Sequence, residues 1–132
     1  MADRAAGILL DSSVIIAHFR RKLDLFQLVQ QGEPLFMPLV VLGELYKGAQ
    51  KSADISKNTR LIDGFLKVVA VLNPDEETAA CYGRLAAYLE RQGKKIPEND
   101  LWIAALAVAL DMPLATRDDH FLRVDGLDVL MW

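Results

Sequence analysis

The chain has 132 residues, of which 52% are hydrophobic and 25% charged, with one cysteine and a formal net charge of −3. This length and balance are typical of one globular domain over residues 1–132, and no apolar run reaches the ~18 residues that a membrane span requires. The negative charge argues against a general nucleic-acid binder. The lack of a signal-like start and of a cysteine pair leads us to expect a cytoplasmic protein with no membrane contact.

Short apolar runs alternate with helical patterns along the whole chain. In order, the predicted elements are a strand at residues 7–10, helices at 14–19 and 23–30, a strand at 35–37, helices at 39–48 and 53–65, a strand towards the end of 66–72, helices at 78–91 and at 101–110, and strands at 114–116 and 127–130. The helix over 101–110 has no polar residue, so we expect protein to surround it. Strands that alternate with helices predict an α/β fold with a parallel sheet.

Acidic residues recur at equivalent places in this pattern. Asp11 follows the first strand, Asp118 or its neighbour Asp119 follows the strand at 114–116, and Asp100 opens the apolar helix. The carboxyl ends of parallel strands meet at one edge of a sheet, so these side chains are expected to converge there. Glu44 can project to the same edge from its own helix.

Each acid also has a simpler interpretation when it is taken alone. Asp11 and Asp100 both stand where an N-cap residue is expected, since aspartate often caps a helix. Glu44 has Lys47 three residues later and could form an ordinary helical ion pair with it. Only the combination of these acids favours a shared site.

Several carboxylates in one place repel one another, and a divalent cation removes that conflict. A ligand set of oxygen atoms, without cysteine or a persuasive pair of histidines, favours Mg²⁺ or Mn²⁺ over zinc. Such ions polarise phosphoryl oxygens and activate water. The predicted chemistry is therefore phosphodiester hydrolysis.

Four segments of the sequence resemble the four acidic motifs of the PIN-domain ribonucleases. They are residues 9–13, 41–48, 99–105 and 115–121. In length and motif order the chain is most similar to VapC-type toxins of toxin–antitoxin pairs, and the resemblance extends from Ile8 to the end. It implies a three-layer fold in which helices flank a short, mostly parallel central sheet.

The resemblance also implies an activity and partners. The activity is that of an Mg²⁺- or Mn²⁺-dependent endoribonuclease, which hydrolyses RNA phosphodiester bonds and acts as the toxin of a pair. Asp11 and Asp100 match the positions that hold the metal most directly, and Glu44 and Asp118 match the acids that complete its shell. The implied partners are RNA, a second copy of the chain in a homodimer, and a small DNA-binding antitoxin whose tail enters the acidic groove of a toxin–antitoxin hetero-oligomer.

Supporting positions follow from the same resemblance. Ser12 and Ser13 match small polar positions after the first acid, and Thr116 matches a hydroxyl that steadies them by hydrogen bonding. Two departures stand out. Asp119 beside Asp118 makes the fourth acid ambiguous, and Met37-Pro38 stands where relatives often have a small hydroxyl residue, which leaves the support of Glu44 open.

Two other functions are compatible with parts of the pattern. In a non-catalytic partner-binding module of the same fold, the acids would be helix caps. A phospho-accepting aspartate domain also places an aspartate after its first strand, but it needs a further acid nearby and a late lysine, which this chain lacks. The histidines add little: His120 lies near the predicted site and could contact substrate, although a purely structural role is the simpler interpretation.

Overall fold

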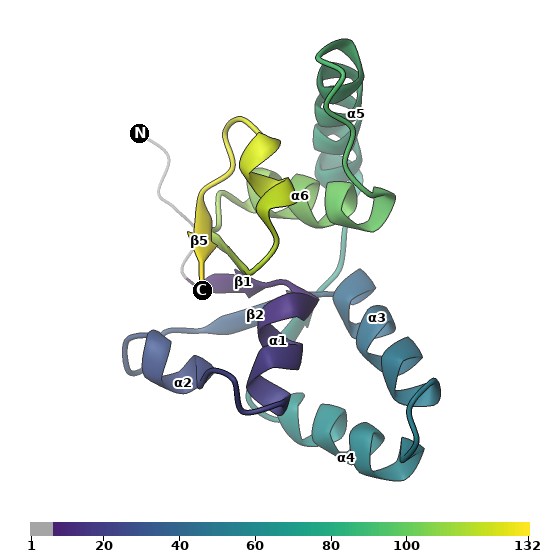
Figure 1. Cartoon of the computed structure of the whole chain (residues 1–132). Helices are drawn as coiled ribbons and strands as arrows, with labels where there is room; N and C mark the ends of the chain where they lie inside the picture. The colour runs from purple at the N-terminus through teal and green to yellow at the C-terminus, as the bar shows by residue number, and fades with distance from the viewer. Residues whose placement is uncertain (1–6) are drawn as a thin grey trace.

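A computed structural model describes residues 7–132 as an α/β fold around a five-stranded sheet with the strand order β3-β2-β1-β4-β5 (Figure 1). The strands are β1 (Ile8–Leu10), β2 (Leu35–Pro38), β3 (Ala70–Leu72), β4 (Leu114–Thr116) and β5 (Val129–Met131). All four neighbouring pairs of strands are parallel. The predicted fold class, a parallel central sheet flanked by helices, is confirmed.

Helices cover both faces of the sheet. They are α1 (Ser12–Phe19), α2 (Leu25–Leu28), α3 (Leu39–Gln50), α4 (Ile55–Phe65), α5 (Glu76–Arg91) and α6 (Glu98–Leu110), with a 3₁₀ helix η1 (Asp119–Arg123) after β4. In Figure 1, α5 and α6 lie above the strands, and α1 and α4 lie below them. None of the described helices is long and apolar enough to cross a membrane.

The central elements are buried because their sequences are apolar on every side. Leu9 and Leu10 of β1 are fully buried, as expected for a strand that is covered on both faces. In α6, the side chains from Ile103 to Ala107 are all buried, and α5 packs against this helix. The prediction that protein surrounds the apolar helix is confirmed, and this helix therefore holds its first turn in a fixed place.

Two predicted elements differ from the structure. The helix predicted at 23–30 is a single turn, α2, which Asp24 caps and which ends where Val29 adopts an extended conformation. Only Leu25 of that turn is buried, while Phe26 and Leu28 are 48% and 47% exposed. Because the turn has no second buried apolar residue, tertiary packing does not stabilise a longer helix there.

The start of α6 also differs from the expected cap. Its N-cap residue is Pro97, so Asp100 lies in the first turn of the helix and does not cap it. Proline fixes φ near the helical value and has no N–H to leave unpaired, which makes it a good residue for this junction. The Asp100 carboxylate is consequently available for other contacts.

Candidate active site

A groove at the carboxyl edge of the sheet brings the predicted acids together. Its volume is about 490 Å³, and its lining residues are Asp11, Ser12, Ser13, Glu44, Pro97, Glu98, Asn99, Asp100, Asp118 and His120. The four acids come from the end of β1, the middle of α3, the first turn of α6 and the segment after β4. Asp119 is exposed and does not line the groove, so Asp118 is the acid that the structure places with the other three.

Two hydroxyl groups fix the carboxylate of Asp11, whose exposed fraction is only 4%. Ser13 Oγ and Thr116 Oγ1 each donate to Asp11 Oδ2 at 2.8 Å, and the two hydroxyl oxygens are 3.2 Å apart. The backbone N–H of Arg117 donates to Ser13 Oγ at 2.9 Å, and that of Asp118 donates to Thr116 Oγ1 at 3.0 Å. This network joins the start of α1 to the end of β4 and holds Asp11 in one orientation.

The surroundings of Asp100 disfavour the charged form of its carboxylate. Burial raises its pKa above the usual value, and the negative charges of Asp11 and Asp118 raise it further. His120 acts in the opposite direction and favours the charged form. Like charges in a partly dry groove explain both the direction and the order of these effects.

Glu44 shows the same behaviour from the opposite side of the groove. Burial raises its pKa most, followed by the charges of Asp11 and Asp100, while Asn99 and Ser12 favour the charged form. Within residues 7–132 its Oε1 atom is buried and has no hydrogen-bond partner. No ion pair joins Glu44 to Lys47 in this part of the chain, so the helical ion pair considered for it is not formed.

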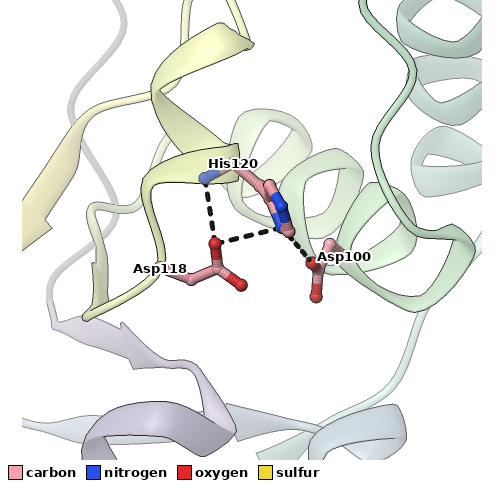
Figure 2. Close-up of side chains that lie close together, drawn as sticks. All are labelled: Asp100, Asp118 and His120. Carbon is pink, nitrogen blue, oxygen red and sulfur yellow. Dashed lines mark hydrogen bonds and ion pairs between the residues drawn. The ribbon is translucent and has the colours of Figure 1, made fainter.

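His120 reaches the groove because Asp118 turns the chain. Asp118 Oδ1 accepts a hydrogen bond from the backbone N–H of His120 at 3.0 Å and caps η1. His120 Nδ1 then lies 3.0 Å from Asp118 Oδ1 and 3.5 Å from Asp100 Oδ2 (Figure 2). Two carboxylate oxygens and one imidazole nitrogen, from three different residues, thus lie within 4.8 Å of one another.

The helix-cap interpretation of the acids does not hold for the two that matter most. Asp11 occupies the N-cap position of α1 but makes no side-chain capping bond, and Asp100 is not an N-cap. By contrast, Asp24, Asp54 and Asp75 accept the expected capping bonds at helices outside the groove. The free N–H groups at the starts of α1 and α6 leave positive potential near the acids.

The residues fit a divalent cation. Four carboxylates offer hard oxygen ligands, which suit Mg²⁺ and Mn²⁺. Among the described residues, the buried side-chain atoms without a hydrogen-bond partner are Glu44 Oε1 and His120 Nδ1, and both residues line this groove. An uncompensated buried polar atom is costly. The ligand atoms of Asp100, Asp118 and His120 lie within 4.8 Å of one another, so a cation at that point would be a partner for His120 Nδ1.

Two groove residues, Asn99 and His120, act on the acids, although the sequence does not place them among the predicted site residues. Asn99 sits beside Asp100 and favours the charged form of Glu44, which gives that acid the support that Met37-Pro38 left open. For His120 the sequence suggests a possible contact with substrate, with a structural role as the simpler interpretation, because a single histidine is a weak signal. Its spacing of two from Asp118, the same offset that lets an aspartate cap its own turn, is the signal that could have placed it.

The protein is thus an α/β protein with an acidic groove at the carboxyl edge of its parallel sheet, where hydroxyl groups orient one of the acids. Such a groove is suited to a divalent cation. The chain matches the PIN domain family over residues 8–127. It is 33% identical over 129 residues to ribonuclease VapC1 of Haemophilus influenzae strain R2866, and the matched residues cover 94% of this chain and 96% of that protein.

Solved structures show the same similarity. VapBC2 from Rickettsia felis bound to a DNA fragment from their promoter contains a chain with a TM-score of 0.88 and 26% identity, covering 95% of this chain and 98% of that one. VapBC-1 from nontypeable Haemophilus influenzae gives a TM-score of 0.86 at 31% identity, covering 95% and 97%. The chain belongs to the PIN domain family, in its VapC branch.

Proposed function

We propose that the protein is a divalent-metal-dependent endoribonuclease that acts as the toxin of a toxin–antitoxin pair. The observation that carries the proposal is the convergence of Asp11, Glu44, Asp100 and Asp118 in one groove, where burial, and then repulsion between the acids, raises the pKa values of Glu44 and Asp100. The VapC ribonucleases to which the chain is similar support RNA as the substrate.

Asp11, Glu44, Asp100 and Asp118 would hold Mg²⁺ or Mn²⁺. When bound, such an ion supplies a polarised phosphoryl group and an activated attacking water. Asp11 contributes a carboxylate that Ser13 and Thr116 have already oriented, so little ordering remains to be done when substrate arrives. Asn99 and Ser12 favour the charged form of Glu44, which is the form that a cation needs.

The substrate's backbone requires cationic contacts near these acids. Arg117 is exposed, and its backbone N–H already bonds Ser13, so its side chain begins directly beside the groove. The exposed Lys94 and Lys95 lie in the loop that leads into α6. These positions suit contacts to phosphates on either side of the cleaved bond, because phosphate contacts position a nucleic acid.

The test is cleavage of RNA by the purified protein. With Mg²⁺ or Mn²⁺ present we expect cleavage, and we expect Asp11→Asn or Asp100→Asn to reduce its rate by more than ~100-fold because each removes a charged ligand. Asp119→Asn is the matched control, since that acid lies outside the groove, and it should keep full activity.

Sequencing of RNA ends after brief expression in cells would identify the substrate. Excess EDTA should stop the reaction, and circular dichroism should show that both inactive variants remain folded. Full activity of Asp100→Asn, or activity that survives EDTA, would overturn the proposed function.

The antitoxin is expected to occupy a second hollow, which adjoins the first. A space of about 350 Å³ is lined by residues of α1, α3 and α4, including Ile16, Leu45 and Leu61, and it shares Glu44 with the acidic groove. The VapBC structures that the chain resembles support a protein partner, and the apolar lining of this hollow is the reason to propose that the partner binds there. The proposal also includes a homodimer, for which the apolar hollow between Leu39 and Trp102 is an available surface.

A further inference from the structure

The imidazole of His120 is placed as a ligand would be placed. Its side chain is 36% exposed, yet the Nδ1 atom itself is buried and forms no hydrogen bond within the described part of the chain. In Figure 2 the ring lies between the carboxylates of Asp100 and Asp118 with Nδ1 directed at both. A surface histidine would normally turn its nitrogen to water or to a well-aligned acceptor.

The separations around Nδ1 match the edges of a coordination shell. Ligand atoms at ~2.1 Å from an octahedral ion stand ~3 Å from their neighbours. Nδ1 is 3.0 Å from Asp118 Oδ1 and 3.5 Å from Asp100 Oδ2, and ligand atoms of all three residues lie within 4.8 Å of one another. Nδ1 faces both carboxylate oxygens at these distances, so a cation held by the two carboxylates would also be within reach of Nδ1.

The backbone fixes this arrangement before any ion binds. The His120 N–H donates to Asp118 Oδ1, and the buried Phe121 that follows holds η1 against the core. Nδ1 therefore approaches Asp118 through a short, closed turn rather than through a flexible loop. Such pre-organisation is typical of residues that bind a metal.

We infer that His120 is a nitrogen ligand, through Nδ1, of the divalent ion held by Asp100 and Asp118, and that it biases the site towards Mn²⁺ over Mg²⁺. The inference rests on the proposed function, which supplies the ion. Imidazole suits transition metals, whereas Mg²⁺ strongly prefers oxygen. In this state Nδ1 carries no proton, and the ring proton resides on Nε2.

The direct test is pulsed electron paramagnetic resonance on Mn²⁺ bound to the full chain. His18 and His120 are the two histidines of the sequence, so coupling of Mn²⁺ to an imidazole nitrogen would come from one of them. We expect the wild-type protein to show this coupling and His120→Asn to lose it. The Mn²⁺ dissociation constant of His120→Asn should rise by ~10-fold or more, with a smaller change for Mg²⁺.

Asp119→Asn is the matched control, because it alters the adjacent residue outside the groove and should keep the coupling. Mn²⁺ bound in a way that Asp100→Asn abolishes, but without nitrogen coupling in the wild type, would overturn the role of His120 and leave the proposed function standing. Failure of the wild type to bind either Mn²⁺ or Mg²⁺ would overturn both. The wild-type spectrum decides the matter even if His120→Asn folds poorly.

Discussion

At the scale of single residues, three of the four acids divide into two kinds. Asp11 is buried but receives two hydroxyl hydrogen bonds, which stabilise its charge. Asp100 and Glu44 lie partly dry and face other carboxylates, so their charged forms are disfavoured in the metal-free protein. Folding without an ion therefore carries an electrostatic penalty that is concentrated on these two side chains.

This penalty makes the stability of the metal-free protein depend on pH. The folded pKa of Asp100 is raised above its ordinary value of 3.8, so its favourable contribution is complete below that value and is lost as pH rises through the folded pKa. Asp100→Asn removes the term. In EDTA at pH 7 the variant should melt a few degrees above the wild type, and the difference should disappear below about pH 4.

Thermal unfolding from pH 3 to pH 8 in EDTA measures this effect. Adding Mn²⁺ should reverse the order at neutral pH, because an ion that binds only the folded wild type raises its melting temperature. Asp119→Asn serves as the control and should follow the wild type throughout. A variant that is less stable than the wild type in EDTA at pH 7 would show that Asp100 is not under electrostatic strain.

At the scale of helices and strands, acids at helix starts do two different jobs. Asp54 accepts a hydrogen bond from the backbone N–H of Lys57 at 3.0 Å and so caps α4, far from the groove in the chain. Asp11 stands at the equivalent position of α1 but bonds Ser13 and Thr116 instead. The first acid stabilises its helix, and the second is reserved for the site.

The difference predicts that substitution of Asp54 lowers the stability of the protein and leaves ion binding intact. Asp54→Ala should lower the free energy of unfolding by about 1 kcal/mol, or about 4 °C in melting temperature, because α4 loses its cap. The rise in melting temperature that Mn²⁺ produces should be unchanged in this variant. Differential scanning calorimetry with and without Mn²⁺ would measure both, and a loss of the ion effect in Asp54→Ala would contradict the division.

The same distinction explains what could be predicted from the sequence. Strand followed by aspartate recurs at Asp11 and Asp118, and chain topology alone carries both to one edge of the sheet. The interpretation of Asp100 as an N-cap residue was wrong because α6 begins earlier, with Pro97 at the N-cap position, and Asp100 lies in the first turn of the helix. The position of His120 depends on the side-chain bond that closes η1, which no periodicity reveals.

At the scale of the whole molecule, the acidic groove and the second hollow lie next to each other, because both are lined by Glu44. Glu44 lies in the middle of α3, where one side of the helix borders the acidic groove and the other borders the hollow formed with α1 and α4. A chain seated along the second hollow would end beside the four acids. The proposed antitoxin, bound in the second hollow, would therefore block cleavage if its chain continued into the place that substrate must occupy.

Leu61 provides the means to separate the two functions. It lies on α4, lines the second hollow and is 39% exposed, so an acidic residue is tolerated there in the free protein. Leu61→Asp should weaken binding of the proposed antitoxin by ~10-fold or more, because an apolar side chain buried in the complex contributes ~1.5–3 kcal/mol. RNA cleavage by the free protein should be unchanged, since Leu61 does not line the acidic groove.

Ile55→Asp is the matched control, because it makes the same change on the same helix at a residue that is 42% exposed and does not line the hollow. Isothermal titration of each variant with the antitoxin, together with a cleavage assay, separates the outcomes. Equal weakening by both substitutions would indicate a general effect of charge on α4. Only a loss confined to Leu61→Asp, with cleavage intact, places the partner in the hollow that ends at Glu44.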